Sequence, residues 1–217
     1  VMIATANAEM IMRATHDQDL CAILNAAALV VPDGAGTVWA AHHLGHAMPE
    51  RVAGYDLVQE LLREAPAERR RIYFFGSAPG VAEKAKAKAE RLYPGIEIVG
   101  VRDGFFKPED NAAIIAEIRA AQPDLLLVAL GVPKQEKWIS AHLAELGVPV
   151  AIGVGGTLDV MAGVMKRAPR WMQRAKLEWL FRGALQPKRA GRLMALPRFV
   201  FKVMAYKKSR QRKGTRL

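Results

Sequence analysis

The chain is organised around the stretch Gly153-Val-Gly-Gly-Thr-Leu-Asp-Val-Met-Ala-Gly163, which follows an apolar run at 149–152. An apolar strand that ends in a glycine-rich turn and then opens a helix leaves several backbone N–H groups directed at one point, and many chains bind phosphate in this way. A tight turn without a ligand is the alternative, and the glycines alone do not separate the two hypotheses. Other parts of the chain must decide between them.

Apolar runs alternate with helical patterns along most of the chain. We predict strands at 1–6, 26–31, 71–75, 96–101, 124–130 and 149–152, and helices at 8–14, 37–44, 81–92, 111–121 and 137–146. This alternation is typical of an open parallel sheet with helices on both faces, so we predict a Rossmann-like α/β fold. We divide the chain into a Rossmann-like catalytic core at 1–165 and a basic helical appendage at 166–217.

The net charge of +11 is unevenly distributed. Residues 166–217 contain 17 lysines and arginines and one acid, Glu178, whereas residues 1–165 contain 15 basic and 20 acidic residues. A basic segment of this kind favours anionic lipid headgroups or nucleic acid as a partner. Because the core is acidic and has few aromatic residues, we predict an anionic membrane surface and no nucleic acid.

Within the appendage, apolar residues recur at helical spacing beside lysines and arginines. They are Leu193, Leu196, Val200, Val203 and Met204, with Phe199 next to them. We predict a segment that lies in the membrane interface, with Pro197 starting or interrupting its helix and with disorder at 207–213. No stretch approaches the roughly 18 apolar residues of a spanning helix, so we expect a peripheral protein on the cytoplasmic face of the plasma membrane.

The single cysteine, Cys21, stands in an apolar run and offers no disulfide framework. We expect it to be a small core residue in a reducing compartment. No signal peptide is visible, and because Val1 falls inside a predicted strand, we expect the natural chain to begin before it.

Polar residues and glycines follow three of the predicted strands. They are Thr5 and Asn7 at the carboxyl end of the first strand, Asp33 after the second, and Gly76 and Ser77 after the third. The carboxyl ends of parallel strands share one edge of the sheet, where ligands bind, so Asp33 is our candidate general base and Gly76 and Ser77 are candidate phosphate or ribose contacts. A helix N-cap at Asn7 and an ordinary turn aspartate at Asp33 are the alternatives.

Two groups of residues suggest a metal at first sight. A D-x-D motif of the kind that can bind a metal occurs at Asp17-Gln-Asp19, but its place before a helical pattern favours a helix start. His42, His43 and His46 lack a nearby Cys or the Glu of a zinc helix and are interpreted as surface residues. We therefore predict no metal and no cofactor.

Arg51 is interpreted as a solvated loop cation or as a phosphate contact.

Seven short motifs occur in one order along the chain. They are Thr5-Ala-Asn7, Pro32-Asp-Gly34, Pro49-Glu-Arg51, Gly131 with Pro133-Lys-Gln-Glu136, Gly153-Val-Gly-Gly156 with Asp159, Arg167-Ala-Pro169 with Trp171, and Leu177-Glu-Trp-Leu180. With them the chain resembles the WecG/TagA/CpsF glycosyltransferases, glycosyltransferase family 26, over residues 1–192. It departs from the family's pattern at Leu158, Lys176 and Gln186.

This resemblance implies an inverting transferase that moves N-acetylmannosamine from UDP-ManNAc to the 4-hydroxyl of N-acetylglucosamine on undecaprenyl diphosphate. The reaction belongs to the synthesis of the wall teichoic acid linkage or of a related surface polysaccharide. Relatives with a ManNAc uronic acid or glucose donor are the alternative. An assembly of identical chains is left open.

The resemblance also implies roles for individual residues. Asp33 would be the general base, and Thr5 and Asn7 would line its pocket. The predicted substrate contacts are Arg51, Gly76, Ser77, Gly131, Lys134, Gln135, Glu136, Gly155, Gly156, Asp159, Arg182, Arg189 and Arg192. Of these, Gln135 would contact a sugar, the glycine turn with Asp159 would contact UDP, and the arginines would contact diphosphate. A solvated basic face is the alternative for the three arginines of the appendage.

Two other classes of protein share parts of this pattern. A dinucleotide-dependent oxidoreductase has the same alternation of strands and helices, but its G-x-G-x-x-G fingerprint fails at Leu158, where the third glycine would stand. A nucleic-acid-binding protein could use the basic appendage, but its core would need basic patches with exposed aromatic residues. We therefore favour the transferase.

Overall fold

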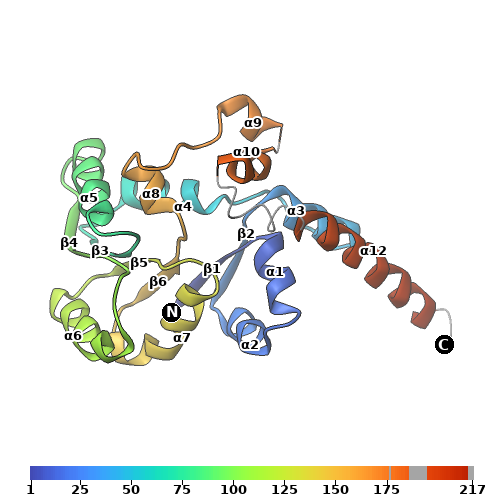
Figure 1. Cartoon of the computed structure of the whole chain (residues 1–217), viewed down its shortest axis with the longest axis horizontal. Coiled ribbons are helices and arrows are strands. Elements are labelled where there is room, and N and C mark those ends of the chain that lie inside the picture. Colours follow the sequence, from blue (N-terminus) through green and yellow to red (C-terminus); the bar gives the residue numbers. More distant parts are fainter. Residues whose placement is uncertain (176, 186–194, 215–217) are drawn as a thin grey trace. The chain divides into compact units, whose positions relative to one another are not determined.

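The computed structural model describes residues 1–175, 177–185 and 195–214 of the 217-residue chain (Figure 1). By its contacts the chain divides into two compact units. Unit 1 comprises Val1–Thr5, Gln18–Val31 and Ala53–Lys166, and unit 2 comprises Ala6–Asp17, Pro32–Val52 and Arg167–Leu217. The segments of the two units thus alternate along the chain. The functional division at residue 165 stays a prediction.

A six-stranded sheet forms the framework of the fold. Its strands are β1 Met2–Ala6, β2 Leu29–Pro32, β3 Arg71–Gly76, β4 Glu97–Arg102, β5 Leu125–Ala129 and β6 Val150–Gly153. They lie in the order β2-β1-β6-β5-β3-β4, and the recorded pairings of β1 with β6, β6 with β5, β5 with β3 and β3 with β4 are all parallel. The predicted Rossmann-like α/β fold is confirmed.

The strand order reverses at two points of this sheet. β1 lies between β2 and β6, and β3 lies between β4 and β5. At each of these points, the connections that leave two neighbouring strands run to opposite sides of the sheet. A crevice is therefore left at the carboxyl ends of these two strands. Both reversals therefore mark places where an α/β protein can bind a ligand.

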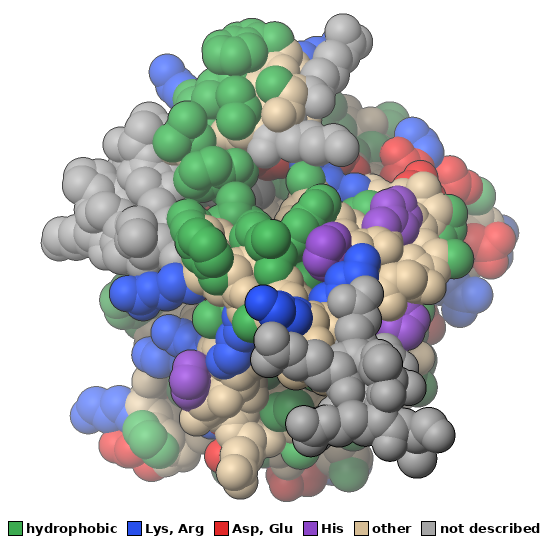
Figure 2. All heavy atoms as spheres, turned by 90° about the vertical axis from the view of Figure 1, so that its right-hand side faces the viewer, with side chains coloured by type: hydrophobic (Ala, Val, Ile, Leu, Met, Phe, Trp, Pro, Cys, Tyr) green, Lys and Arg blue, Asp and Glu red, His purple; other side chains and the backbone are tan. Residues whose placement is uncertain are grey.

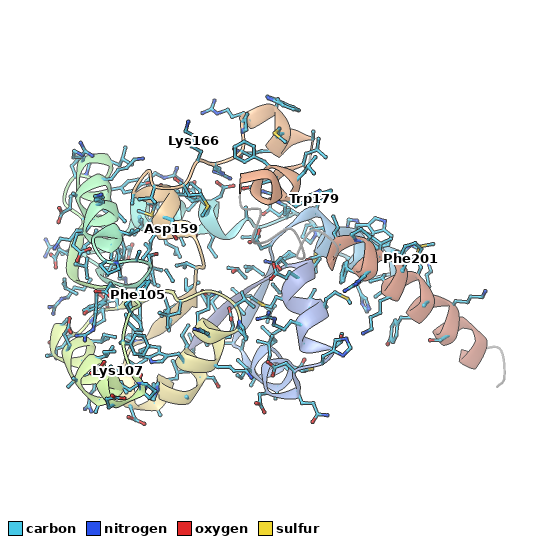
Figure 3. All side chains as sticks on the ribbon, in the orientation of Figure 1. Phe105, Lys107, Asp159, Lys166, Trp179 and Phe201 are labelled. Atoms are coloured by element: carbon cyan, nitrogen blue, oxygen red, sulfur yellow. The ribbon has the colours of Figure 1, made fainter. Side chains whose placement is uncertain are left out.

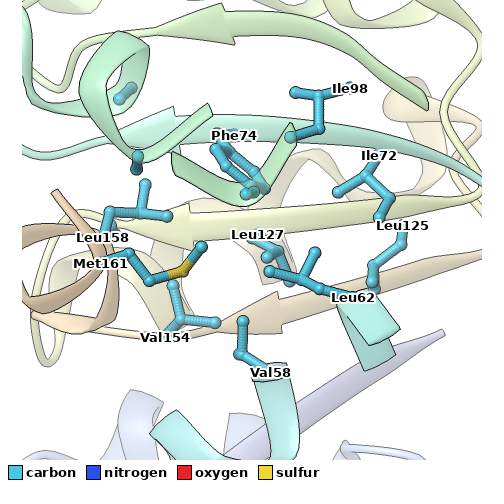
Figure 4. Packing of buried hydrophobic residues seen from close by; sticks show 14 of the residues in the cluster. Val58, Leu62, Ile72, Phe74, Ile98, Leu125, Leu127, Val154, Leu158 and Met161 are labelled. Atoms are coloured by element: carbon cyan, nitrogen blue, oxygen red, sulfur yellow. The ribbon is translucent and has the colours of Figure 1, made fainter. Parts of the chain in front are cut away.

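Helices cover both faces of the sheet in unit 1. They are α2 Gln18–Ala26, α4 Gly54–Glu64, α5 Val81–Leu92, α6 Asn111–Ala121, α7 Lys134–Leu146 and the short α8 Thr157–Met161, with a 3-10 turn η1 at Pro108–Asp110. One core includes Phe74 of β3 and Leu127 of β5 and lies under α4, α5 and α8 (Figure 4). The other includes Tyr73 and Phe75 and lies under α2, α6 and α7. Consecutive β3 residues thus enter opposite cores, as the two-residue period of a strand requires.

Unit 2 is built from helices. They are α1 Ala8–Ala14, α3 Ala35–His43, α9 Arg170–Arg174, α10 Glu178–Leu185 and α12 Ala195–Gly214. Helix α12 packs on α1 and α3 through Phe199 and Val203, which are buried against Ala40. A Cβ on Gly36 would lie 2.9 Å from Leu196 Cδ1, so the start of α3 approaches α12 closely.

Several local predictions agree with the structure. Helices were predicted at 8–14, 81–92 and 111–121, and α1, α5 and α6 have the same limits. Asp19 lies in the first turn of α2, which confirms the helix start. His42 and His46 are exposed, which confirms that they are surface residues.

Four other local expectations are corrected. Cys21 is exposed because only Leu20 of α2 is buried, so the helical period turns the cysteine outward. Helix α4 was not predicted, and α7 begins three residues earlier than expected. Residues 207–213 were expected to be disordered, but α12 continues through them to Gly214. Lysine, arginine and glutamine favour helices, which explains this extension.

Comparison of two glycines with positive φ distinguishes the effect of steric overlap from the effect of backbone strain. Gly76 has φ +120°, and a Cβ there would lie 2.5 Å from the backbone carbonyl of Ala129, whereas Gly80 has φ +78° and open space around it. We predict that Gly76→Ala lowers the free energy of unfolding by about 3 kcal/mol or more, because overlap adds to strain. Gly80→Ala should cost about 1 kcal/mol. Urea denaturation of both variants tests this, and equal losses would contradict it.

Candidate functional site

In unit 1, a side-chain hydrogen bond links the carboxyl ends of β1 and β6. The Thr5 hydroxyl donates a hydrogen bond to the carbonyl oxygen of Gly153 at 3.2 Å. The Thr5 side chain is buried, and Gly153 opens the glycine turn that was predicted to bind a nucleotide. Thr5 thus fixes the start of that turn.

Gln135 connects two glycine turns in unit 1. Its Oε1 accepts hydrogen bonds from the backbone N–H of Gly131 at 3.1 Å and of Gly155 at 2.9 Å. Its Nε2 donates to Oε1 of Glu136 at 2.7 Å. Gln135 is 1% exposed and Glu136 is 0% exposed. The turn after β5 and the turn after β6 are therefore held by one buried amide.

Close packing leaves no space for a larger residue at the base of this cluster. A Cβ on Gly153 would lie 2.6 Å from Nε2 of Gln135. Gly131 and Gly155 have φ values of +78° and +52°, which favour glycine. The structure thus brings Thr5, Gly131, Gln135 and Gly155 together, and it gives Gln135 a positioning function. Direct contact of Gln135 with a sugar stays a prediction.

The turn after β3 meets the turn after β6. Ser77 has a φ of +63°, and its N–H donates to the carbonyl oxygen of Ala129 at 2.9 Å. Its hydroxyl donates to Oδ2 of Asp159 at 3.4 Å. A Cβ on Gly156 would lie 3.7 Å from the same oxygen. Ser77, Gly156 and Asp159 therefore form a second group of predicted residues on the carboxyl edge of unit 1.

A pocket of about 920 Å³ opens beside Ser77 at the reversal next to β3. Its lining includes Lys134, which was predicted as a contact, and also Phe105, Lys107 and Trp138, which were not. The missed residues belong to α7 and to the segment that follows β4. For Phe105 and Lys107, the signal in the sequence was a pair of phenylalanines and a lysine four to six residues after the strand predicted at 96–101.

Asn7 and Asp33 are neighbours in unit 2. The N–H of Met10 donates to Oδ1 of Asn7 at 3.0 Å, which confirms the N-cap of α1. The N–H of Asp33 donates to the carbonyl oxygen of Ala6 at 2.9 Å, and a Cβ on Gly34 would lie 3.9 Å from Cβ of Asn7. The Asp33 side chain is half-buried. The structure thus brings these two predicted residues together at the ends of β1 and β2.

One carboxylate holds two guanidinium groups in unit 2. Glu178 Oε2 lies 3.3 Å from Nη2 of Arg51, and Oε1 lies 3.9 Å from Nε of Arg167. The Arg51 side chain is 24% exposed and that of Glu178 is 13% exposed. Arg51 is therefore not a solvated loop cation. One carboxylate of this cluster thus faces two guanidinium groups.

The predicted residues fall into two groups. Thr5, Gln135, Gly155, Ser77 and Asp159 belong to unit 1. Asn7, Asp33 and Arg51 belong to unit 2. A single crevice that gathers both groups stays a prediction. The side chain of Arg182 and all of Arg189 and Arg192 lie outside the described residues.

In the described part of the chain, no group of three or more histidine, cysteine, aspartate or glutamate residues is placed to hold a metal ion. Independence from metal stays a prediction. Within the same residues, no helix is long and apolar enough to cross a membrane.

The parallel sheet and the glycine turns along its carboxyl edge define an α/β protein of the Rossmann-like class. Residues 1–213 match the glycosyl transferase WecG/TagA/CpsF family, and the chain belongs to this family. The resemblance inferred from the motifs is confirmed, and the protein is a glycosyltransferase.

Three bacterial relatives share one name, N-acetylglucosaminyldiphosphoundecaprenol N-acetyl-beta-D-mannosaminyltransferase. That of Bacillus subtilis (strain 168) is 35% identical over 210 residues, which cover 97% of this chain and 81% of the relative. That of Bacillus spizizenii is 36% identical, with 95% and 80% covered. That of Staphylococcus aureus (strain NCTC 8325) is 34% identical, with 96% and 81% covered.

Replacement of Gln135 by leucine tests its positioning function. Gln135→Leu leaves the N–H groups of Gly131 and Gly155 without their acceptor, so we predict a loss of about 2–4 kcal/mol in the free energy of unfolding. Hydrogen exchange should accelerate at both glycines. The exposed neighbour Lys134→Ala is the control and should change stability by about 0.5 kcal/mol or less. Unchanged exchange at Gly155 would contradict the assignment.

Proposed function

We propose that this protein transfers N-acetylmannosamine from UDP-ManNAc to the 4-hydroxyl of N-acetylglucosamine on undecaprenyl diphosphate. The observation that carries the proposal is the 34–36% identity, over 95–97% of the chain, to relatives named for this transfer. The product would serve the wall teichoic acid linkage or a related surface polysaccharide. Transfer from a uronic acid or glucose donor within the same family is the alternative.

Asp33 is the proposed general base. In a single displacement, a carboxylate takes the proton of the acceptor hydroxyl while that oxygen attacks the anomeric carbon and the nucleotide diphosphate departs. Asp33 follows β2 directly, and its backbone is held by Ala6 beside the capped start of α1. This support from β1 and α1 keeps the Asp33 backbone at the end of its strand.

The glycine turns of unit 1 are the proposed site of the UDP donor. Gln135 holds the turns after β5 and β6, and Ser77 links the turn after β3 to Asp159. Three loops on one sheet edge are thus cross-linked by buried or half-buried hydrogen bonds. A site whose loops are already ordered loses less entropy when it binds a nucleotide.

The arginine cluster of unit 2 is the proposed site for diphosphate. A guanidinium group is planar and can donate two parallel hydrogen bonds to phosphate oxygens. Glu178 accepts a hydrogen bond from Arg51 at 3.3 Å, and Nε of Arg167 lies 3.9 Å from the same carboxylate, so two guanidinium groups lie close to each other. We propose that such arginines stabilise the departing diphosphate and that the reaction needs no metal.

Transfer by the intact chain tests the proposed function. Wild-type protein, a panel of UDP-sugars and a short-chain N-acetylglucosaminyl diphosphate lipid are combined, and UDP release and the glycolipid product are measured. UDP-ManNAc should give the highest kcat/KM. A higher value for a uronic acid or glucose donor would establish the alternative within the family. No transfer from any UDP-sugar would refute the proposal.

Asp33→Asn tests the assignment of the base. We predict that kcat falls by about 10²–10⁴-fold because the amide cannot take the proton, while UDP affinity stays within about threefold. Asp19→Asn is the control, because the Asp19 side chain is 84% exposed in the helix start of α2. Its turnover should equal that of the wild type. Near-native turnover of Asp33→Asn would show that another group is the base.

The proposed partner of α12 is an anionic membrane surface on the cytoplasmic side. One face of α12 packs on α1 and α3, with Phe199 3% exposed and Val203 8% exposed. Phe201, Met204 and Tyr206 are 73%, 50% and 55% exposed. Figure 2 looks onto the side where α12 ends and shows hydrophobic side chains beside lysines and arginines. Such a helix can insert apolar side chains while its bases meet lipid headgroups.

Vesicle binding tests this partner. We predict that replacing Phe201, Met204 and Tyr206 by serine weakens binding to phosphatidylglycerol vesicles at least about tenfold, because less apolar surface is buried. Sedimentation with vesicles measures the change, and turnover on a water-soluble acceptor should stay within about twofold. Leu92→Ser is the control, since Leu92 is 54% exposed on α5 of unit 1. Equal binding of the triple variant and the wild type would exclude this surface.

A further inference from the structure

The turn that carries Asp33 leads into a helix whose start lacks a side-chain cap. The N-cap of α3 is Gly34, which has a φ of +109° and makes no side-chain hydrogen bond to the first turn. By contrast, the Asn7 side chain caps α1 and accepts from the N–H of Met10. A helix start without such a cap is weakly fixed by its own residues. The position of Asp33 therefore depends on contacts from elsewhere in unit 2.

Thr37, in the first turn of α3, supplies one of these contacts. Its hydroxyl donates a hydrogen bond to the carbonyl oxygen of Ala6 at 3.2 Å. The N–H of Asp33 donates to the same oxygen at 2.9 Å. A carbonyl oxygen has two lone pairs and can accept both bonds, and Ala6 is 4% exposed, which limits competition from water. The two ends of the turn 33–37 are thus held at one point at the end of β1.

Backbone contacts bring the other candidate residues of unit 2 close to this anchor. Ala6 directly precedes Asn7 in the sequence. The N–H of Val52 donates to the carbonyl oxygen of Pro32 at 3.1 Å, which brings the segment with Arg51 to the residue before the proposed base. Movement of the turn 33–37 would therefore change the spacing among the three candidate side chains.

Apolar packing holds the rest of α3 independently of the Thr37 hydroxyl. Helix α12, on which Figure 3 labels Phe201, packs on α1 and α3. Ala40 of α3 is buried in one cluster with Phe199 and Val203 of α12. Removal of the hydroxyl leaves these contacts in place. We therefore expect α3 to stay folded without it, while its first turn gains freedom to move.

We propose that Thr37 is a positioning residue for Asp33, the proposed general base. This inference rests on the proposed function, in which the carboxylate takes a proton from the acceptor hydroxyl. Proton transfer requires the two oxygens to lie within about 2.6–3.2 Å of each other, so a small displacement of the carboxylate lowers the rate. In this assignment Thr37 acts through the backbone of the turn and does not contact the substrate.

Turnover of the intact chain with UDP-ManNAc and a short-chain N-acetylglucosaminyl diphosphate lipid tests the assignment. Thr37→Val replaces the hydroxyl by a methyl group and should lower kcat about tenfold, because the carboxylate is displaced. KM for both substrates should stay within about twofold of the wild type, because the loss is confined to the chemical step. Thr37→Ser keeps the hydroxyl and should restore most of the lost turnover.

A second substitution guards against a loss of folding in Thr37→Val. Thr37→Ala also removes the hydroxyl, and alanine is the strongest helix former, so α3 should be kept. Its kcat should fall as in Thr37→Val. Wild-type kcat in Thr37→Ala would overturn the inference. So would a kcat of Thr37→Ser as low as that of Thr37→Val.

Thr15→Val is the matched control. The Thr15 hydroxyl also donates to a backbone carbonyl oxygen, that of Met12 at 2.7 Å, and it accepts from Nζ of Lys202 at 2.8 Å. Thr15 is the C-cap of α1, at the opposite end of this helix from Asn7. Its replacement should leave kcat at the wild-type value. An equal fall in kcat for Thr15→Val and Thr37→Val would indicate a general loss of stability in unit 2 and would contradict the assignment.

A double-mutant cycle separates positioning of the base from a merely structural function. If Thr37 acts through the Asp33 carboxylate, Thr37→Val should have little further effect on turnover once Asp33→Asn has removed that carboxylate. Residues that act as a unit are not additive in this way. The same loss of kcat in the wild-type and the Asp33→Asn backgrounds would show that Thr37 acts independently of the base, and the inference would be wrong.

Failure of this inference differs from failure of the proposed function. If the wild type transfers ManNAc and Thr37→Val turns over equally fast, the positioning residue alone is wrong. If the wild type transfers sugar from no UDP-sugar, the proposed function is wrong. Near-native turnover of Asp33→Asn would instead show that the base is misassigned, and Thr37 would lose the residue that it positions.

Discussion

The arrangement of the sheet edge depends on one buried amide. Gln135 Oε1 accepts the N–H groups of Gly131 and Gly155, and Gly153 lacks a side chain where Gln135 Nε2 must pass. The Gln135 side chain is buried, so its Oε1 needs donors within the protein, and the N–H groups of two half-buried glycines supply them. Gln135 provides both hydrogen bonds and thereby makes one rigid structure of two turns that follow different strands. The donor site that we propose depends on this cross-link.

A related constraint operates among the charges of unit 2. Glu178 is the only acid in residues 166–217, and it is paired with Arg51 and Arg167. The half-buried carboxylate accepts a hydrogen bond from Arg51 and lies 3.9 Å from Nε of Arg167, so both guanidinium groups are held near one acid. The cluster can therefore be ordered before an anion arrives. The diphosphate site that we propose depends on this order among the charges.

The environment of two residues in the structure could not be predicted from their positions in the sequence. Contact of Gln135 with a sugar stays a prediction, and the structure adds a positioning function, because α7 begins at Lys134 and places the amide in the interior, 1% exposed, where it holds two glycine turns. Phe105 is not among the predicted contacts, because a phenylalanine after a strand is usually a core residue. Its exposure follows from the hydrogen bonds of Gly104 and Asp103, which have no counterpart in hydrophobic periodicity.

The sequence by itself determined the class of fold, the order of its strands, most of the helices of the core and the family, because periodicity, turn chemistry and ordered motifs are local properties of the chain. It also located the basic segment and the polar ends of the strands. Tertiary structure decided which of these residues meet. Gln135 reaches Gly155 across 20 positions, and Arg51 reaches Glu178 across 127. Such contacts depend on how strands are ordered in the sheet and on how helices pack, and neither property leaves a periodic trace in the sequence.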